Sequence, residues 1–337
     1  MKAKFVKVFR FLFFLLASIA LLYFAFRSID PEQLMIRIRQ SDYRWVALSL
    51  VFAFLALMVR SFRWRLLIET IDARPSLLHV LHAINIGYMA NFVFPRIGEI
   101  TRCAALNRTD RLPVDSVFGT VIVERIFDIL MTGLILLLIL LLKFDMVGDF
   151  MAHHILEPVT GRIPDTAVIL RITAALVAGI VAVVPIVWIF RSRLAKIAAL
   201  RKIKGWIIGV SNGVRSIYKV KNTGLFLITN VLVFGMYFLQ TYIMFMAFEM
   251  TSSLGIADAL FILVISSLSF IIPVQGGIGA YHWIVAMGLT VFGLSYEDGM
   301  VYALMSHTST SLLLIVLGGI SVMTVFYKNK FQKNKIK

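Results

Sequence analysis

Long apolar runs separated by short polar segments dominate this chain of 337 residues. A helix needs about 20 mostly apolar residues to cross a bilayer. By this measure we predict full spans at about 8–26, 45–60, 117–142, 167–190, 224–248 and 300–326. The pattern predicts an all-α, polytopic integral membrane protein, with residues 1–337 forming a single transmembrane domain.

Two further apolar regions are broken in ways that a simple span does not explain. Residues 77–94 end at Pro95, and the continuation 97–112 is too charged to cross lipid. Residues 256–272 and 279–293 are joined by a turn of proline and glycine residues, which break helices. Non-helical backbone at membrane depth requires protein or a water-filled cavity around it. We therefore predict two re-entrant hairpins in addition to the six spans.

Basic residues orient these segments. The linker 191–222 carries nine lysine and arginine residues and no acidic residue, and the tail 327–337 is also basic. The positive-inside rule therefore places both segments, and both chain ends, in the cytoplasm. By parity the first hairpin enters from the cytoplasm and the second from outside. The loop 27–44 fits this orientation poorly, since it is predicted to be external yet holds four arginines beside three acidic residues.

Composition supports the membrane class and narrows the partners. Hydrophobic residues make up 60% of the chain, charged residues only 15%, and the mean hydropathy is +0.88. A net charge of +16 raises the question of nucleic acid, but the basic residues flank the predicted spans. Anionic phospholipid head groups are therefore the expected partner. The single cysteine, Cys103, excludes an internal disulfide and is interpreted as a packing residue.

Charged residues inside the apolar runs are the strongest functional signal. Glu124, Arg125 and Asp128 stand within the span 117–142. A charge near the bilayer centre costs roughly 2.5–3.5 kcal/mol on insertion scales and usually marks a substrate or ion pathway. Four-residue spacing places Glu124 and Asp128 on one helix face. The pattern indicates transport or lipid handling rather than a passive anchor.

The predicted hairpin tips share a short pattern. Residues 94–98 and 272–276 each read as an apolar residue, proline, two further residues and glycine. Paired, opposed, Pro/Gly-interrupted segments are the best sequence pointer to a substrate site in transporters built from inverted repeats. We therefore expect the two tips to meet near the middle of the membrane.

Two interpretations of the charges remain open. Arginine binds phosphate through two parallel hydrogen bonds, and a glycine turn lets a head group approach the backbone. A lipid phosphate would then lie between Arg96, Arg125 and the second tip; alternatively, the charges only lock helices together. We expect Arg96, Glu99, Arg125 and Asp128 around a single cavity. The candidate lipid-binding residues are Arg96, Glu99, Arg102, Glu124, Arg125, Asp128, Gly276, Gly277 and Gly279.

Other polar residues are weaker candidates. His79 and His82 share a helix face, where packing or hydrogen bonding is favoured over metal binding. The polar run 306–311 either lines the same cavity or bonds neighbouring helices. No P-loop motif occurs, so ATP-driven pumping by this chain alone is not expected. We predict no metal ion, no cofactor and no catalytic residue.

Four motifs in order resemble those of a known family: Arg60-Ser-Phe-Arg63-Trp64, Pro95-Arg96-x-Gly98-Glu99-x-x-Arg102, Glu124-Arg125-x-x-Asp128 and Pro273-x-x-Gly276-Gly277-x-Gly279. The series is similar to the lysylphosphatidylglycerol synthase transmembrane-region family, also described as flippase-like. The resemblance implies an integral protein of the bacterial inner membrane that handles or translocates lipids. Bifunctional members add a soluble domain that transfers an aminoacyl group to phosphatidylglycerol. This chain ends about ten residues after its last predicted span, so that activity is not expected here.

The preferred hypothesis is a non-enzymatic flippase for a phospholipid or a lipid-linked glycan. The alternative is a membrane-embedded enzyme or enzyme subunit that modifies a lipid head group, with Glu99, Glu124 or Asp128 as acid or base. The sequence leaves open which lipid is moved, in which direction, with what energy source and in what oligomeric state.

Overall fold

The computed structural model describes residues 2–27, 29–143, 148 and 220–334, and the side chains of 12–27, 29–143, 148 and 220–326. Within these ranges the chain is helical and contains no strand. The α-helices are α1 (Lys2–Phe26), α2 (Pro31–Arg39), α3 (Tyr43–Ile68), α4 (Leu77–Val93), α5 (Gly98–Asp110), α6 (Val114–Leu142), α11 (Thr223–Phe245), α12 (Ile256–Ser269), α13 (Ala280–Thr290) and α14 (Tyr296–Asn334). Short 3-10 turns are η1 (Glu69–Ile71), η5 (Glu249–Thr251) and η6 (Gln275–Gly277). The predicted all-α class is confirmed.

Four described helical segments are long and apolar enough to cross a membrane: Tyr43–Ile71, Val114–Leu142, Thr223–Phe245 and Tyr296–Phe326. A fifth candidate joins Leu12–Phe26 of α1 to α2 through a bend of 85°. These segments match five of the six predicted spans. The sixth, 167–190, and nearly all of the linker 191–222 lie outside the described residues. The chain is a multi-pass membrane protein.

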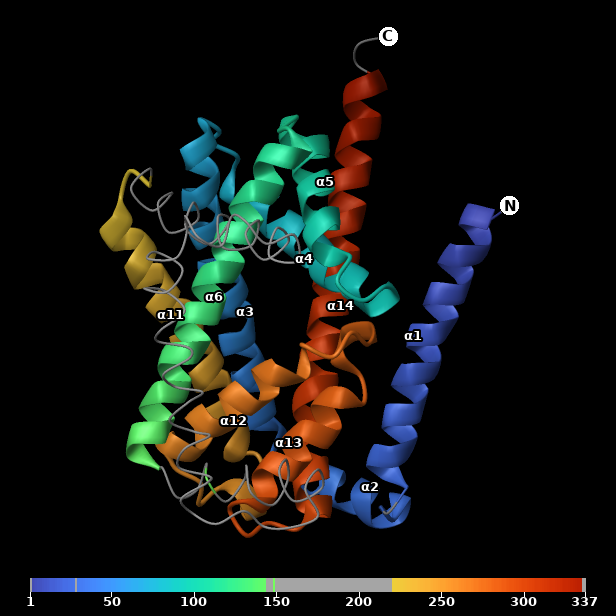
Figure 1. Cartoon of the computed structure of the whole chain (residues 1–337), viewed down its shortest axis with the longest axis vertical. Helices are drawn as coiled ribbons and strands as arrows, with labels where there is room; N and C mark the ends of the chain where they lie inside the picture. The colour runs from blue at the N-terminus through green and yellow to red at the C-terminus, as the bar shows by residue number, and fades with distance from the viewer. Residues whose placement is uncertain (1, 28, 144–147, 149–219, 335–337) are drawn as a thin grey trace, which may run out of the picture.

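The outer faces of the long helices are apolar. Exposed side chains include Ile129 and Leu141 on α6, Val231 on α11 and Met323 on α14. Large contiguous apolar surface on a folded chain marks contact with another apolar phase. The long helices α3, α6, α11 and α14 run roughly along the long axis of the molecule (Figure 1). Their outer faces therefore suit contact with lipid.

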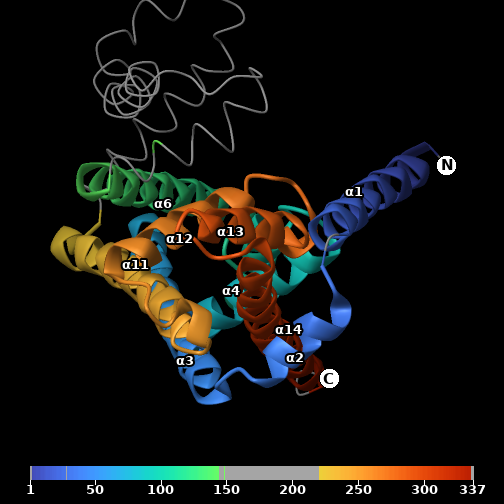
Figure 2. The same ribbon diagram turned by 90° about the horizontal axis from the view of Figure 1, so that it is seen from below.

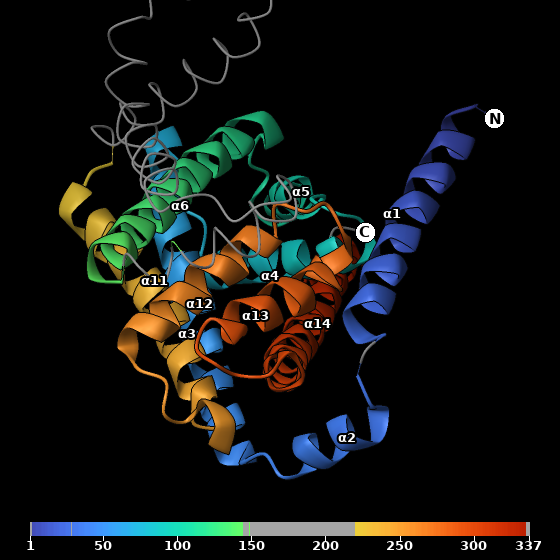
Figure 3. The ribbon, with the colours of Figure 1, turned by 60° about the horizontal axis from the view of Figure 1, so that its bottom comes forward.

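Helix α1 stands at the side of the other helices and contacts them mainly through α13 and η6 (Figure 2). Pro31 begins α2, and the side chain of Asp30 caps it by accepting a hydrogen bond from the backbone N–H of Glu32. Helix α2 then connects the end of α1 to the start of α3 at one end of the molecule (Figure 3). An ion pair between Arg37 and Asp298 fastens α2 to the start of α14.

The two broken regions form opposed helical hairpins. Helices α4 and α5 occupy the half of the molecule that holds the start of α1 and the end of α14, whereas α12 and α13 occupy the other half (Figure 1). Helices α4, α12 and α13 have 17, 14 and 11 residues, and none of them is among the spanning candidates. The hairpins thus enter from opposite ends, and the first shares its end with the chain termini.

The tips of the hairpins meet, as the shared Pro/Gly pattern predicts. Arg96 donates a hydrogen bond from Nη2 to the carbonyl oxygen of Ile271 at 2.7 Å. The ring of Phe92 lies directly over Gly276, where an added Cβ would approach it to 2.4 Å. Gly276 also has a positive φ of 58°, which only glycine adopts readily. The second tip therefore requires glycine for both conformation and space.

Two apolar cores support the hairpins separately. One core packs α4 and α5 against α3 and α6, with Trp64, Ile84 and Leu106 fully or nearly fully buried. The other packs α12 and α13 against α11 and α14 around Ile262 and Tyr302. Burial of each large apolar side chain contributes about 1.5–3 kcal/mol. Each hairpin is thus held by its own apolar core.

Candidate functional site

A buried ionic network joins α3, α5 and α6, and Glu124 lies at its centre. The Glu124 side chain is fully buried, and Oε1 lies 2.8 Å from Nε of Arg60 and 3.0 Å from Nη2 of Arg63. Its other oxygen lies 2.7 Å from Nη1 of Arg102. One carboxylate therefore contacts three guanidinium groups. This compensation explains how the chain keeps so many charges away from water.

Arg60 and Arg63 reach this centre because α3 continues past the first arginine to Ile68. A spacing of three residues places both side chains on the same side of the helix. Arg63 is fully buried and donates hydrogen bonds to Asn230 at 2.9 Å and Asp128 at 2.7 Å. The α3–α11 packing supplies Asn230, since these two helices make the most extensive contact in the described chain.

Aromatic hydroxyl groups complete the shell around Arg60. Its Nη1 donates to Tyr88 Oη at 2.7 Å and to Tyr237 Oη at 3.2 Å. Its Nη2 donates to Asp128 Oδ2 at 3.2 Å. Arg60 thereby bridges α4, α6 and α11, and its position depends on all three helices.

Arg102 is held by an aromatic face and by one carboxylate. Its guanidinium carbon lies 4.3 Å from the ring centroid of Trp64, within the range of a cation–π interaction. Trp64 is oriented in turn by a hydrogen bond from Nε1 to Thr120 Oγ1 at 3.0 Å. Arg102 Nε and Nη2 are buried and lack a hydrogen-bond acceptor among the residues that the structure describes. Two donor nitrogens of this guanidinium are thus free for another acceptor.

Arg125 occupies the open edge of the network. It contacts Glu99 Oε1 at 3.1 Å and Asp128 Oδ2 at 3.2 Å. Its side chain is 42% exposed, whereas those of Arg60, Arg63 and Arg102 are at most 5% exposed. Glu99 is also partly exposed, at 26%. The pair Arg125–Glu99 is therefore the part of the network that can move at least cost.

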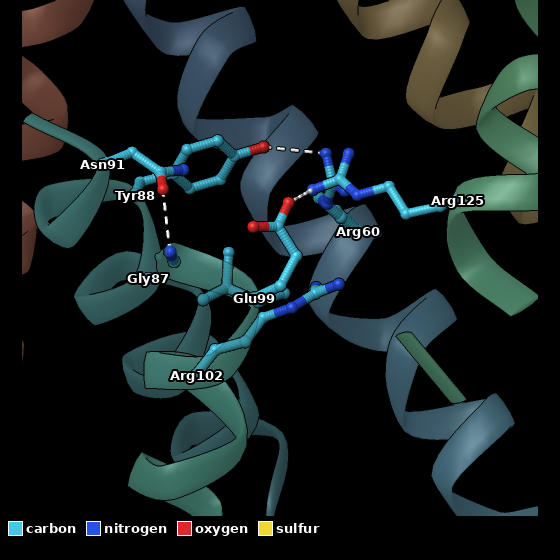
Figure 4. A pocket seen from close by; sticks show the side chains of 9 residues that line it. Arg60, Gly87, Tyr88, Asn91, Glu99, Arg102 and Arg125 are labelled. Atoms are coloured by element: carbon cyan, nitrogen blue, oxygen red, sulfur yellow. Dashed lines mark hydrogen bonds and ion pairs between the residues drawn. The ribbon is translucent and has the colours of Figure 1, made fainter. Parts of the chain in front are cut away.

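A small cavity lies at this edge, between the first hairpin and α6. Its lining includes Arg60, Tyr88, Glu99, Arg102 and Arg125, and Figure 4 shows Glu99 and Arg125 reaching toward each other across it. The volume of about 20 Å³ holds about one water molecule. A phosphate is larger, so the described conformation is closed to a lipid head group.

Charge in the network does not balance. In the described chain, four guanidinium groups (Arg60, Arg63, Arg102 and Arg125) contact three carboxylates (Glu99, Glu124 and Asp128), which leaves one positive charge in excess. A monoanion at the cavity would neutralise this excess. Guanidinium groups with free N–H donors suit the oxygens of a phosphate or carboxylate.

Helices α4 and α5 pack unusually closely beside the cavity, along a seam formed by Gly87, Asn91 and Gly98. A Cβ on Gly98 would lie 2.3 Å from the carbonyl oxygen of Gly87. Asn91 closes the same seam by accepting a hydrogen bond from the backbone N–H of Gly98 at 2.8 Å. This contact positions Glu99 and Arg102 because they follow Gly98 in the first turns of α5.

The structure brings together five of the nine candidate residues: Glu99, Arg102, Glu124, Arg125 and Asp128. Arg96 does not join them, against our expectation. Its φ of 61° turns the chain out of α4, and its guanidinium bonds the second tip instead. Gly276, Gly277 and Gly279 form that second tip, each with a positive φ. The residues that we expected around a single cavity therefore lie at two separate locations. One is the ionic network and the other is the contact between the hairpin tips.

Sequence reasoning did not include Arg60, Arg63, Tyr88, Asn230 and Tyr237 in the site. The predicted span 45–60 stopped at the first arginine, because a charge ordinarily marks the end of a span. The available signal was the pair of arginines three residues apart, directly after an apolar run. A buried carboxylate on another helix needs such a partner, and Glu124 was already known from the sequence.

Among the described residues no group of three or more His, Cys, Asp or Glu side chains is arranged to hold a metal ion. His79 instead pairs with Asp110, with Nδ1 at 3.0 Å from Oδ1, and His82 Nδ1 lies 3.0 Å from Ser321 Oγ. The hydrogen-bonding interpretation of these histidines is confirmed. Ser306 and Thr310 of the polar run bond Tyr281 and Gln240 on neighbouring helices.

Comparisons with known proteins agree with this architecture. A UPF0104 membrane protein of Methanothermobacter thermautotrophicus is 24% identical over 298 residues, which cover 79% of this chain and 81% of the relative. A protein named glycosyltransferase AglD, from Haloferax volcanii, is 29% identical over 103 residues. That match covers 30% of this chain and only 16% of the relative. No solved structure matches the chain.

The family comparison covers the network and both hairpin tips. The family model described as the lysylphosphatidylglycerol synthase TM region matches residues 10–318. All nine candidate residues and both additional arginines fall within this range. The chain is a multi-pass membrane protein that belongs to the family of the lysylphosphatidylglycerol synthase TM region.

Proposed function

We propose that this protein moves a lipid with an anionic head group across the membrane, and that the ionic network binds the head group. The observation that carries the proposal is the excess of one guanidinium group over carboxylates in the network, with free N–H donors on Arg102 and a partly exposed Arg125 at the cavity edge. In a fold that faces lipid, an excess buried charge is costly unless a ligand of opposite charge binds beside it. Phospholipid phosphates are the abundant anions of that environment.

Access to the site requires the first hairpin to shift. The cavity is too small for phosphate, and Glu99 occupies the place beside Arg125 that a phosphate oxygen would take. Displacement of Glu99 by phosphate exchanges one anionic partner of Arg125 for another. The exchange costs little because both side chains are already partly exposed.

Opposed hairpins with touching tips favour alternating access over a static binding site. The first hairpin opens toward one end of the molecule and the second toward the other (Figure 1). The tips touch at Arg96–Ile271 and at Phe92–Gly276. In an alternating-access cycle, movement of one hairpin at a time would open the network first to one side of the membrane and then to the other. We place the protein in the cytoplasmic membrane with both chain ends in the cytoplasm.

A binding measurement tests the site directly. Purified protein is titrated with short-chain phosphatidylglycerol and, separately, with a diacylglycerol of the same chains, and bound lipid is counted by native mass spectrometry. We expect binding that requires the phosphate and that falls at least about tenfold in Arg125→Ala, since a lost hydrogen bond to a charged group costs about 1.5–3 kcal/mol. Arg125→Lys keeps the charge but loses the two-pronged geometry, so it should bind with intermediate affinity.

The control variant is Arg74→Ala, which removes an exposed arginine that forms no ion pair in the described chain. It should bind lipid as the unmodified protein does. If Arg125→Ala folds and still binds with unchanged affinity, the network only locks the helices together.

A second candidate function is modification of a lipid head group. It is favoured by the partial relative named glycosyltransferase AglD and by the presence of three carboxylates in the network. Each of these carboxylates contacts at least one arginine, which suits charge compensation better than proton transfer. Mass spectrometry of lipids incubated with the protein distinguishes the two, because an enzyme changes the lipid mass and a translocase does not.

A further inference from the structure

A pair of buried histidines lies behind the second hairpin tip, apart from the ionic network. His282, near the start of α13, and His307, in α14, are 3% and 8% exposed, and their ring centroids lie 4.8 Å apart. Both rings bond the backbone of the glycine turn. His307 Nε2 lies 2.9 Å from the carbonyl oxygen of Gly276, and His282 Nδ1 accepts a hydrogen bond from the backbone N–H of Gly279 at 3.2 Å.

These bonds fix which nitrogen of each ring carries hydrogen. A carbonyl oxygen only accepts, so His307 carries its hydrogen on Nε2 and keeps a lone pair on Nδ1. His282 accepts at Nδ1, so a neutral His282 carries its hydrogen on Nε2. That Nε2 is fully buried and has no partner in the described chain. An unpaired buried donor is destabilising, so the arrangement is one hydrogen bond short.

We infer that His282 and His307 form a binding site for a single proton, and that uptake of this proton releases the second hairpin tip. The proton adds to Nδ1 of His307 and is shared with Nε2 of His282, whose own hydrogen moves to Nδ1. The ring centroids lie 4.8 Å apart but Nε2 of His282 has no partner in the described conformation, so in this inference the shared N–H···N bond forms only as the rings turn toward each other on proton uptake. Two positive rings at this distance repel each other, so the pair takes one proton and not two.

Release of the tip follows from the same hydrogen count. Once Nδ1 of His282 carries hydrogen, it no longer accepts the N–H of Gly279, and the bond that caps the start of α13 is lost. The Gly276–Gly279 turn then keeps its bond to His307, and its remaining hydrogen bond to α13 runs from the backbone N–H of Trp283 to the carbonyl oxygen of Gly279 at 3.0 Å. Because the turn packs against Phe92 of the first tip and Leu21 of α1, its release loosens the contact between tips.

Few other titratable groups face the pair. Tyr281 lies 4.9 Å from His307 between ring centroids, and Tyr302 donates to the carbonyl oxygen of Thr241. Charged groups on the packed elements are engaged elsewhere: Arg27 lies over Phe24, Asp258 caps Gly255, and Asp298 is bound by Arg37 and Ser295. On the facing tip, Arg96 bonds Ile271. The acid response of the tip is therefore assigned to the histidines.

The distance between tips measures the release. Val93 and Ile271 are exposed residues at the two tips, so spin labels at Val93→Cys and Ile271→Cys in a Cys103→Ser background report their separation by double electron–electron resonance. The protein is placed in nanodiscs of phosphatidylcholine without anionic lipid. We expect a single short distance at pH 7.5 and a second, longer component at pH 5.

Two substitutions preserve the hydrogen bonds but remove the proton site. His282→Asn places an amide oxygen at the position of Nδ1, and His307→Gln places an amide N–H at the position of Nε2. Each should show the short distance alone at pH 5. The control His79→Asn changes a histidine that pairs with Asp110, and it should keep the acid response. A longer component that persists in both pair variants, or its absence from the labelled parent, overturns the inference.

Nitrogen-15 spectra of the unmodified protein provide a test that no folding defect can obscure. At pH 7.5 both rings should be neutral with hydrogen on Nε2, and at pH 5 the pair should hold one additional proton. Two charged rings, or two rings that remain neutral, contradict the inference. Neither experiment involves lipid movement, so the proton site stands or falls separately from the proposed translocation.

Discussion

Arg63 on α3 and Glu124 on α6 lie 61 positions apart in sequence, yet Nη2 of the arginine is 3.0 Å from Oε1 of the glutamate and both side chains are fully buried. This pair joins two membrane helices in a buried position where neither charge would be tolerated alone. It also fixes the position from which the rest of the network extends toward the cavity.

Glu124→Gln should destabilise the protein strongly. The carboxylate is the shared partner of three buried arginines, and an amide leaves their charges under-compensated. Loss of one partner of a buried pair costs about 3–5 kcal/mol, which a thermal unfolding assay in detergent detects as a lower Tm. Asp115→Asn, at an exposed position on the same helix, is the matched control and should leave the Tm nearly unchanged. Equal stability of the two variants would mean that the network contributes little to folding.

Gly98→Ala should separate α4 from α5. The added methyl group would lie 2.3 Å from the carbonyl oxygen of Gly87, a backbone atom that cannot move aside cheaply. Overpacking of this kind costs about 1–3 kcal/mol. Gly119→Ala is the control, because an added Cβ meets nothing within 4 Å there and alanine favours a helix by up to about 1 kcal/mol. The thermal unfolding midpoint should fall for Gly98→Ala and stay level or rise for Gly119→Ala. The reverse order would contradict the close packing of α4 against α5.

Two substitutions of Arg96 test whether the backbone of the first tip is strained by its positive φ. At a φ of 61°, alanine has a backbone strain of about 1 kcal/mol that glycine does not have. Both Arg96→Gly and Arg96→Ala lose the hydrogen bond to Ile271, so the difference between them isolates the backbone. Arg96→Gly should therefore have the higher Tm. Identical values would show that the tip relaxes out of this conformation without the arginine.

Cys103 should be almost inert toward alkylating reagents in the folded protein. Burial in α5 raises the pKa of the thiol to about 11, so the reactive thiolate is scarce at pH 8. Since a raised pKa favours the thiol, the rate should increase about tenfold per pH unit until pH nears 11. Iodoacetamide labelling followed by mass spectrometry should be at least about a hundredfold slower than in denaturant, where the ordinary pKa of about 8.5 applies. The double variant Cys103→Ser with Ala104→Cys exposes the thiol on the same helix and should react readily.

Much of the fold follows from the sequence because membrane helices obey a simple length rule. Apolar runs located the described spans, and Pro95 and Pro273 located the breaks of the two hairpins. The hairpin assignment succeeded because α4 and α12 are too short to cross a bilayer alone. These features are local and therefore readable one segment at a time.

The site was only partly predictable because its contacts are between distant segments. Glu99, Arg102 and Arg125 stood out as charges beside apolar runs, but nothing local indicates that Glu124 selects Arg60 and Arg63. Arg96 was grouped with the network on sequence proximity to Glu99. The left-handed turn at Arg96 reverses its direction, and backbone conformation of this kind is not visible in a pattern of residue types.

Transbilayer movement of a fluorescent phosphatidylglycerol in proteoliposomes tests the central claim most directly. Dithionite reduces only outer-leaflet lipid, so the unmodified protein and Arg74→Ala should speed the loss of the protected inner-leaflet fluorescence relative to protein-free vesicles. Arg125→Ala, which removes an arginine that is 42% exposed, should be at least about tenfold slower, with Arg125→Lys in between. If folded Arg125→Ala moves the lipid at the unmodified rate, or if the unmodified protein moves none, the ionic network is not the head-group site of a lipid translocase.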